Sequence, residues 1–264
     1  MRKLGILGLG HMGMAIAKGA AVSIGKDAVA GYDPSPEKRT AGEMLGIEIA
    51  DSVSRLCESA HIVLVAVRPQ DIEGLLNELK ASHPQCLLTI AAGIPIRRYT
   101  DALGPLPVIR AMPNTPLQLG EGAVALCRNE LCSEEDFRFA IELFRSMGTA
   151  CEISEDHMCD IIAVNGSTPA YFYYLIECLL EDAVSRGISR EDARELLVQT
   201  MIGSGKMLME QKEKPISVFV DEVCSKGGTT IEAINVLKEA DFQKLIRDAD
   251  EACIRRAEEL GKQY

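Results

Sequence analysis

The stretch LGILGLGHMG, from Leu4 to Gly13, decides the fold of this chain. A short apolar run leads into Gly8-x-Gly10-x-x-Gly13, and apolar residues at helical spacing follow it. An acid, Asp33, stands 20 residues after Gly13, at the end of the next strand-like run. The glycine spacing alone is weak evidence, but a strand before it, a helix after it and an acid beyond form the fingerprint of dinucleotide-binding βαβ units. The segment therefore predicts a Rossmann-type fold.

Each glycine of this turn has a predicted role. Gly8 permits the tight turn, Gly10 lets a pyrophosphate approach the main chain, and Gly13 lets helix and strand pack closely. The helix N-terminus adds free N–H groups and a partial positive charge. A purely structural strand–turn–helix is the alternative. The residues expected to bind a dinucleotide here are Gly8, Leu9, Gly10, His11, Met12 and Gly13.

The residues after the second strand leave the choice of dinucleotide open. Asp33 is placed to accept hydrogen bonds from the ribose hydroxyls of NAD and would repel a 2′-phosphate. Ser35, Lys38 and Arg39 follow directly and suit a phosphate. We expect NAD(P)H as the cofactor, with Asp33 favouring NADH or dual use and Ser35 as a further contact.

Short β-rich runs alternate with helical patterns through the first half of the chain. Runs that are apolar throughout, such as HIVLVAV, imply burial on both faces and hence a parallel sheet covered by helices. We expect an α/β fold with an N-terminal Rossmann-type doubly wound parallel sheet. The predicted strands are Leu4–Leu7, Ala28–Tyr32, His61–Val67, Cys86–Ile90, Val108–Ala111, Ala123–Cys127 and Ala150–Ile153.

Start patterns for helices lie between these strands. Ser52 and Ser133 are predicted N-caps, and Pro95 suits a first helical turn. Apolar spacing predicts further helices over Met12–Ser23 and Asp71–Ala81.

After about Glu155 no strand pattern remains. The change predicts a dinucleotide-binding domain over residues 1–154 and an all-helical substrate and dimerisation domain over residues 155–264. The expected helical segments are Met158–Arg186, Ser189–Lys212, Pro215–Cys224, Thr230–Leu237 and Asp241–Leu260.

The stretch Met158–Leu180 is apolar nearly all round, whereas a surface helix shows one apolar stripe. In a helical domain of about 110 residues this favours a subunit interface, and hence a homodimer or higher oligomer. A central core helix is the alternative. Polar residues and Pro169 interrupt the stretch, which makes it a poor membrane span.

Composition is that of an ordinary globular protein, with 47% apolar and 25% charged residues among 264. A net charge of −11 argues against a nucleic-acid surface, because phosphates would be repelled. The nine cysteines form no C-x-x-C pair, so free thiols are expected rather than disulfides or a metal site. With no signal-peptide pattern at the N-terminus, we expect a cytoplasmic protein.

Two later strand ends are expected to border the same crevice, because ligands bind outside the carboxyl ends of parallel strands. Small residues at the second would let the nicotinamide ribose approach the main chain. Plain strand–loop connections are the alternative. The candidates are Ala66, Val67, Arg68 and Pro69, followed by Ala91, Ala92 and Gly93.

A second glycine-rich turn, SKGGTT from Ser225 to Thr230, predicts a cradle for a small anion. N–H groups around Gly227, Gly228 and Thr229 can form an anion nest, and the following helix adds its dipole. A simple helix N-cap by Thr229 is the alternative, but it leaves the two glycines unexplained.

Five patterns now stand in order: the fingerprint, AVRPQ, IRAMPNTP (Ile109–Pro116), NGSTPAYF (Asn165–Phe172) and SKGGTT. This set resembles the pyrroline-5-carboxylate reductase family over almost the full length of the chain. RAMPNTP and GGTT are the more specific members of the set.

The resemblance implies reduction of the cyclic imine 1-pyrroline-5-carboxylate to L-proline with NAD(P)H, in proline biosynthesis. It implies that the Thr230 hydroxyl contacts the ring nitrogen as the catalytic group. Ser225, Gly227, Gly228, Thr229 and Asn114 would bind the substrate, and Met112 and Pro113 would border the nicotinamide. It also implies that the helical half of one subunit completes the site of its partner.

The chain departs from the usual family pattern at three positions. Lys226 stands where proline is typical, Thr168 where glycine is typical, and Arg68 where lysine is commoner. Lys226 adds a cation beside the expected carboxylate, and Thr168 adds bulk and a hydroxyl. These changes put the identity of the imine in doubt more than they do hydride transfer.

Two other functions compete with this interpretation. A β-hydroxyacid dehydrogenase shares the fold but needs a catalytic lysine, for which Lys206 is the candidate. A divergent paralogue would reduce another cyclic imine, or bind the cofactor without turnover in a regulatory role. Retention of both Thr229 and Thr230 argues against the non-catalytic form.

Overall fold

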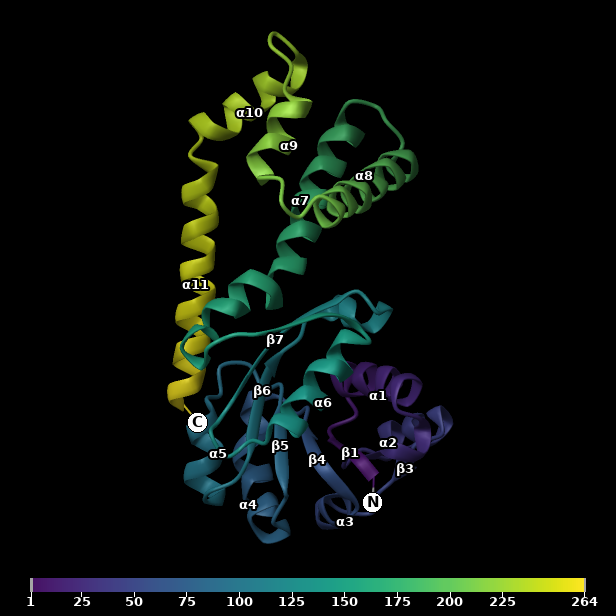
Figure 1. Cartoon of the computed structure of the whole chain (residues 1–264). Coiled ribbons are helices and arrows are strands. Elements are labelled where there is room, and N and C mark those ends of the chain that lie inside the picture. Colours follow the sequence, from purple (N-terminus) through teal and green to yellow (C-terminus); the bar gives the residue numbers. More distant parts are fainter. Residues whose placement is uncertain (1, 264) are drawn as a thin grey trace. The chain divides into compact units, whose positions relative to one another are not determined.

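The computed structural model describes residues 2–263, and its N-terminal part is built on one eight-stranded sheet (Figure 1). The strand order is β3-β2-β1-β4-β5-β6-β7-β8. From β1 the chain fills one side of the sheet and then crosses back to fill the other, which confirms the doubly wound arrangement. The strands are β1 (Arg2–Leu7), β2 (Val29–Tyr32), β3 (Glu48–Ile49), β4 (Ala60–Val65), β5 (Cys86–Thr89), β6 (Val108–Met112), β7 (Gly122–Arg128) and β8 (Gly148–Glu152).

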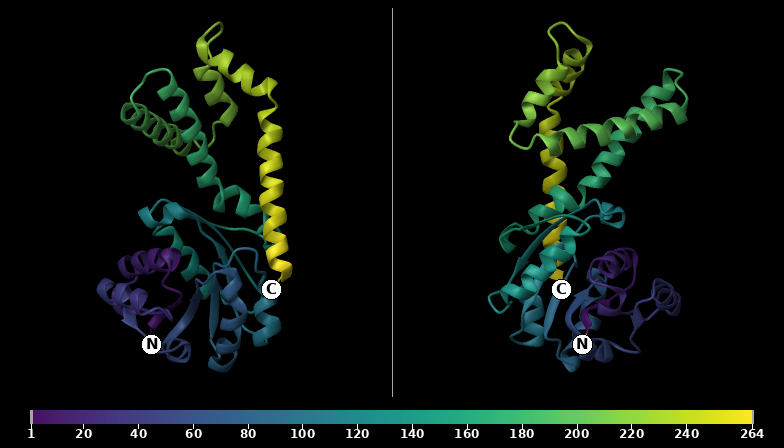
Figure 2. Two further views of the ribbon diagram at one scale, coloured as in Figure 1. Left: turned by 180° about the vertical axis from the view of Figure 1, so that it is seen from behind. Right: turned by 45° about the vertical axis from the view of Figure 1, so that its right-hand side comes forward.

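Two apolar cores, one on each face of the sheet, explain why the central strands carry so few polar residues. On β1, Leu4 and Ile6 belong to one core and Leu7 to the other. The first core lies under α1 (His11–Ser23) and α6 (Glu134–Arg145). The second lies under α3 (Val53–Ser59), α4 (Ile72–Ser82) and α5 (Ile96–Leu103) (Figures 1 and 2). Burial on both faces is what strands that are apolar throughout require.

The predicted caps are confirmed. The Ser52 hydroxyl accepts the N–H of Arg55 at 3.2 Å, and the Ser133 hydroxyl accepts the N–H of Asp136 at 3.0 Å. Each bond satisfies one of the N–H groups that a helix start leaves without an intrahelical partner. Pro95 lies just before α5 rather than within its first turn.

The sheet is mostly but not wholly parallel. β7 runs antiparallel to β6, with Met112 opposite Ala125, so the expectation of a parallel strand here is wrong. The connection holds only the short 3₁₀ helix η3 (Thr115–Leu119), which is too small for the crossover that parallel strands need. Further 3₁₀ helices are η1 (Lys26–Ala28), η2 (Pro69–Asp71) and η4 (Glu155–His157).

One strand and one α-helix were not predicted. Strand β3 has two residues, which is too few to show alternation. Helix α2 (Pro36–Leu45) reads PEKRTAGEML, and Gly42 is its one buried residue, so it carries almost no apolar pattern.

Beyond β8 the described residues form helices and turns and no strand. The Ser189 hydroxyl caps α8 by accepting the N–H of Asp192 at 3.1 Å. The helices are α7 (Thr168–Ser185), α8 (Arg190–Glu210), α9 (Ile216–Val223), α10 (Thr229–Glu239) and α11 (Phe242–Gln263).

The expected segment Met158–Arg186 is not one helix. A π-helix, η5 (Ile162–Gly166), precedes α7, and Ser167 separates the two. Pro169 explains the break, because it has no N–H to continue the hydrogen-bond ladder of the preceding turn.

Helix α7 is largely exposed in the single chain. Phe172, Tyr173 and Tyr174 are each more than half exposed, and Leu180 is the one buried residue of this fully described helix. The alternative of a central core helix is therefore wrong for the isolated chain. Exposed aromatic groups in such a cluster mark an interaction surface.

The chain divides into two compact units. One runs to Pro169 and includes the C-terminal segment from Ala252, and the other is Ala170–Glu251. The predicted domain boundary at residue 155 stays a prediction.

Within residues 2–263, no helix combines the length and apolar character that crossing a bilayer requires. The same range holds no group of three or more His, Cys, Asp or Glu side chains arranged for a metal ion.

Candidate active site

The glycine turn after β1 has the geometry that its sequence predicts. Gly8 has φ +97°, a conformation that favours glycine, and its N–H donates to Tyr32 at 2.9 Å. A Cβ built on Gly13 would lie 1.9 Å from the carbonyl oxygen of Gly8, so only glycine allows the helix to approach this closely. Gly10 differs, because a Cβ there would meet nothing within 4 Å. Its face is open toward the space where a ligand would lie.

The start of α1 supplies an anion-binding end. The first helical bond runs from the N–H of Met14 to the carbonyl of Gly10 at 2.8 Å. The N–H groups before it have no intrahelical partner, and they carry the positive end of the helix dipole. These groups are suited to a pyrophosphate.

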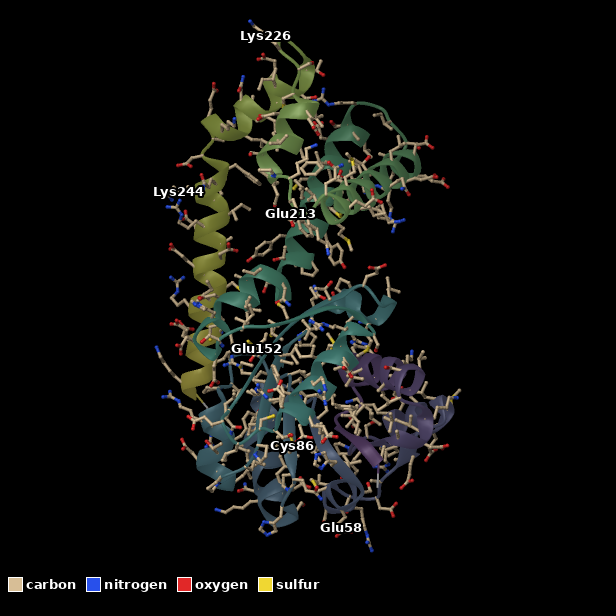
Figure 3. All side chains as sticks on the ribbon, viewed as in Figure 1. Glu58, Cys86, Glu152, Glu213, Lys226 and Lys244 are labelled. Carbon is tan, nitrogen blue, oxygen red and sulfur yellow. The ribbon has the colours of Figure 1, made fainter. Side chains whose placement is uncertain are left out.

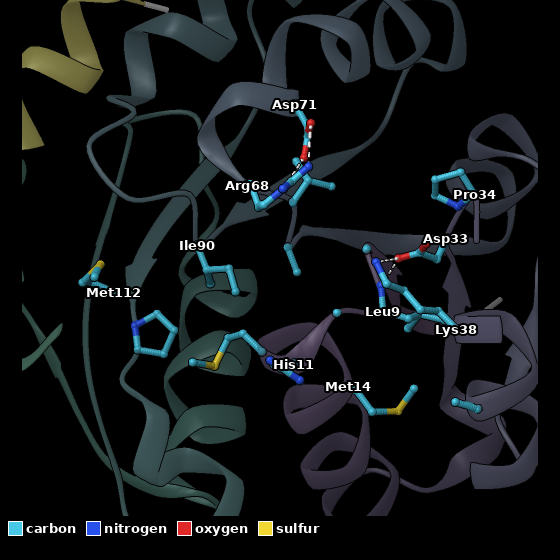
Figure 4. A pocket seen from close by; sticks show the side chains of 17 residues that line it. Leu9, His11, Met14, Asp33, Pro34, Lys38, Arg68, Asp71, Ile90 and Met112 are labelled. Carbon is cyan, nitrogen blue, oxygen red and sulfur yellow. Dashed lines mark hydrogen bonds and ion pairs between the residues drawn. The ribbon is translucent and has the colours of Figure 1, made fainter. Parts of the chain in front are cut away.

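A cleft of about 1150 Å³ opens over this turn (Figure 4). It lies at the carboxyl ends of β1, β2, β4, β5 and β6, where an open α/β sheet binds its ligands. Predicted residues that line it are Gly8, Leu9, Gly10, His11, Met12, Asp33, Ala66, Val67, Arg68, Met112 and Pro113. Lys38, which the sequence marked as suited to a phosphate, also lines it. Residues that line it without having been assigned to the site are Met14, Pro34, Ala41, Asp71 and Ile90.

The unassigned residues follow from those that were assigned. Met14 lies one turn along α1 from Gly10, and Ile90 directly follows β5. Asp71 pairs with Arg68 on the cleft wall, at 2.9 Å between Nε and Oδ2. Met14 could have been predicted from its helical spacing to Gly10, and Ile90 from its position at the end of a predicted strand.

Asp33 is buried and its carboxylate is already engaged. One oxygen accepts the N–H of Leu9 at 2.8 Å and lies 3.3 Å from the ammonium of Lys38. The other accepts the N–H of Ser35 at 2.9 Å, and the side chain is only 3% exposed. The acid therefore holds the glycine turn against the end of β2, and Lys38 offsets its charge. Ser35 itself does not line the cleft.

Several predicted residues lie outside the cleft lining: Gly13, Ser35, Pro69, Ala91, Ala92, Gly93 and Asn114. Gly93 has a different structural role. It has φ +78°, and a Cβ there would lie 2.6 Å from the carbonyl oxygen of Ala257 in α11. Its need for glycine thus arises from close packing against the last helix. Asn114 is also occupied, since its side-chain oxygen accepts the N–H of Ala123 at 2.9 Å.

The turn Ser225–Thr230 lies in the second compact unit. Gly227 has φ +74°, and the N–H of Gly228 donates to Ser225 at 2.9 Å. Gly228 is the N-cap of α10 and Thr229 its first helical residue, with no side-chain cap bond, so the simple cap by Thr229 is wrong. Lys226 projects outward from this turn (Figure 3). The turn offers main-chain N–H groups and hydroxyls at a helix start.

Residues 155–260 match the family model described as pyrroline-5-carboxylate reductase dimerisation, and residues 3–93 match NADP oxidoreductase, coenzyme F420-dependent. The chain is 36% identical to the pyrroline-5-carboxylate reductase of Escherichia coli strain K12 over 267 residues, and this alignment covers 99% of each protein. The chain belongs to the pyrroline-5-carboxylate reductase family. This confirms the resemblance inferred from its motifs.

Solved pyrroline-5-carboxylate reductases have the same fold. The structure from Coxiella burnetii matches with a TM-score of 0.90 at 30% identity, covering 98% of both chains. The structure of the Plasmodium falciparum reductase with NADP bound matches with a TM-score of 0.88 at 31% identity, again over 98% of both. The β-hydroxyacid dehydrogenase alternative gains no comparable support.

The geometry of the glycine turn in this member of the pyrroline-5-carboxylate reductase family gives a first prediction. Gly10 has φ −69°, which valine adopts without strain, and its Cβ position is open. Gly10→Val should fold normally yet weaken NADPH binding about a hundredfold, the value of one or two charge-assisted hydrogen bonds. Fluorescence titration of the folded variant with NADPH measures this. Unchanged affinity would show that the pyrophosphate does not lie over Gly10.

Proposed function

We propose that this protein reduces 1-pyrroline-5-carboxylate to L-proline with NAD(P)H, as a step of proline biosynthesis. The observation that carries the proposal is the open cleft over Gly10, at the start of α1, in a chain that aligns end to end with such reductases. The direct test follows NADH and NADPH absorbance separately with pyrroline-5-carboxylate and with its six-membered analogue.

The residues of the cleft fit a dinucleotide. The α1 N-terminus suits the pyrophosphate, and Ile90, Met112 and Pro113 provide an apolar wall for the nicotinamide. The reduced nicotinamide, when bound, supplies the hydride for the imine carbon. Among the other predicted contacts, Gly13, Ala91, Ala92 and Gly93 act through the main-chain shape of the cleft rather than by lining it.

The substrate is a small ring with one carboxylate and one C=N bond. Hydride adds to the imine carbon, the C=N electron pair moves to nitrogen, and the protonated nitrogen becomes a secondary amine. A protonated imine is already electrophilic, so hydroxyls and main-chain amides suffice and no strong general base is needed. Thr230 is assigned to the ring nitrogen, and Ser225 with the turn Gly227–Thr229 is assigned to the carboxylate. The N–H of Gly228 already donates to Ser225, so the N–H groups of Gly227 and Thr229 are the proposed donors.

We assign the exposed aromatic face of α7 to the homodimer interface. The family model that matches residues 155–260 describes dimerisation, and Phe172, Tyr173 and Tyr174 are exposed in the single chain. The helical part of one subunit is proposed to complete the cleft of its partner, with the helical domain beginning at residue 155. A cytoplasmic location and the absence of a nucleic-acid partner belong to the same proposal.

Lys226 favours one variant of this function. It places a cation beside the proposed carboxylate site, where the family typically has proline. A cyclic imine with a second acidic group is therefore the second candidate substrate. Comparing kcat/KM for such an imine with that for pyrroline-5-carboxylate separates the two.

The engaged state of Asp33 bears on cofactor preference. Its carboxylate is already bonded to two main-chain N–H groups and faces the ammonium of Lys38, so its repulsion of a 2′-phosphate is reduced. Lys38 lines the cleft and its side chain is 47% exposed. We assign Lys38 to the 2′-phosphate of NADPH, and both NADH and NADPH are proposed as substrates.

Lys38→Ala tests this assignment. Loss of one charge-assisted hydrogen bond should lower kcat/KM for NADPH about tenfold. NADH lacks the 2′-phosphate, so its kcat/KM serves as the internal control and should stay the same. An equal effect on both cofactors, or no effect on either, would place the phosphate elsewhere.

A further inference from the structure

The strands β6 and β7 separate at the nicotinamide end of the cleft. Their ladder pairs Met112, the last residue of β6, with Ala125, and Pro113 follows, which has no N–H to donate. The chain then turns into η3. Main-chain groups of Met112 and Ala123 thus lie at the end of the ladder, beside residues that line the cleft.

Two asparagine side chains extend the ladder past this point. Nδ2 of Asn165 donates to the carbonyl of Met112 at 2.9 Å and to the carbonyl of Ala123 at 2.8 Å. Oδ1 of Asn114 accepts the N–H of Ala123 at 2.9 Å. A single amide nitrogen of Asn165 therefore joins the last residue of β6 to the first part of β7.

The π-helix η5 presents Asn165 to these carbonyls. Its wide turn is closed by the N–H of Ser167, which donates to Ile162 at 2.7 Å. The Thr168 hydroxyl lies 2.5 Å from the carbonyl oxygen of Ala163 and 2.7 Å from that of Val164, both of which belong to this turn. A Cβ on Gly166 would lie 2.5 Å from Cε of Met112, so this turn packs against the tip of the Met112 side chain. Single π turns of this kind are frequent at functional sites.

The arrangement has a cost that points to a role beyond folding. Oδ1 of Asn165 is buried and has no hydrogen-bond partner within the protein, and it is the one such atom among the described side chains, those of residues 4–262. Turning the amide round would place this oxygen against two carbonyl oxygens, so the orientation is fixed by the Nδ2 bonds. An unpaired buried acceptor is unfavourable, and such local exceptions are expected at functional sites.

We propose that Asn165 is a positioning residue for hydride transfer, which fixes the Met112–Asn114 turn as the wall against which the nicotinamide lies. It acts through the carbonyls of Met112 and Ala123 and touches neither substrate nor cofactor. Without its two bonds the wall shifts, and the distance between the hydride donor and the imine carbon changes. Small displacements of this kind lower the rate of the chemical step more than they lower binding.

The inference rests on the proposed function, and the experiment keeps the two apart. Turnover of pyrroline-5-carboxylate by the unmodified protein tests the function. Asn165→Ala is then compared with Asn129→Ala, a matched variant at the opposite end of the same strand pair. Nδ2 of Asn129 donates to Leu106 at 2.8 Å and its Oδ1 accepts the N–H of Val108 at 3.1 Å, far from the cleft lining.

For both variants we measure the melting temperature, the Kd for NADPH, kcat, and the primary isotope effect with NADPH deuterated at the transferred position. Asn165→Ala should lower kcat about tenfold to a hundredfold, as misplacement of reacting groups does. Its isotope effect should rise, because hydride transfer becomes rate-limiting. The Kd for NADPH should change by no more than about threefold. Asn129→Ala should lose stability with kcat within about twofold of the unmodified protein.

Two results would overturn the proposal. One is an Asn165→Ala variant with unchanged kcat and isotope effect. The other is an equal fall of kcat in both variants, which would mean that Asn165 supports only the stability of the strand pair. Should Asn165→Ala fail to fold, Asn165→Ser tests the proposal instead. The serine hydroxyl can donate to one of the two carbonyls at most, so an intermediate kcat with a raised isotope effect is expected.

Discussion

Replacing Thr230 with alanine is expected to lower kcat about a hundredfold, the usual result of removing one donor aimed at the reacting group. The affinity for NADPH should stay the same. Thr230 is the second residue of α10, at the end of the glycine-rich turn, and belongs to the second compact unit. The residues that line the dinucleotide cleft all belong to the first unit. A change at Thr230 should therefore affect the reaction of the imine and not the binding of the cofactor.

Single-turnover kinetics with saturating NADPH, beside a fluorescence titration, separate these two effects. Thr230→Ser keeps the hydroxyl and should recover most of the activity. Thr200→Ala is the matched control, because Thr200 is also a helical threonine of the second unit, and its hydroxyl donates within α8 to Leu196. Alanine is the better helix former, so neither alanine variant should lose helix stability. If Thr230→Ala kept its full kcat, Thr230 would have no contact with the ring nitrogen.

Much of the fold followed from the sequence because the central strands are buried on both faces. Runs such as HIVLVAV are apolar throughout, and a strand of this kind is stable where layers of helices cover both of its faces. The elements that were missed have little burial to leave a pattern. α2 buries only Gly42 and is otherwise exposed or half-buried, and β3 is an edge strand of two residues. The reversed direction of β7 depends on a short connection rather than on the strand's own residues.

The site could be predicted where glycine geometry or strand ends determine it. Gly8, Gly10 and Gly13 have the three different environments that their fingerprint implies. Asp33 shows what a motif does not reveal. An acid at this position predicts a hydrogen bond to the cofactor ribose, but in the structure the carboxylate accepts the N–H of Leu9. Asn165 belongs to a segment that the resemblance included, but its bonds to Met112 and Ala123 join positions 42 to 53 residues apart. Contacts of that kind depend on how distant segments pack, which a single sequence does not display.

The second large effect is expected from mixing two inactive variants. With NADPH near the Kd of the unmodified protein, Gly10→Val should leave its cofactor cleft almost empty. Thr230→Ala should lack a working substrate turn, so each variant should be nearly inactive alone under this condition. If one subunit supplies the cleft and its partner the turn, a mixed dimer contains one site in which both parts are intact. Random mixing makes half of the dimers mixed, so about a quarter of the unmodified activity should return.

The mixture is prepared by unfolding and refolding the two variants together, with each variant refolded alone as the control. Recovery of activity depends on the wild-type Gly10 of one chain acting with the wild-type Thr230 of the other. Sites built from a single chain cannot recover, because every chain in the mixture carries one defect. A mixture that stays as inactive as its components, while size-exclusion and mass measurements confirm mixed dimers, would mean that each subunit folds its own α10 over its own cleft. The exposed aromatic face of α7 would then join subunits without joining their sites.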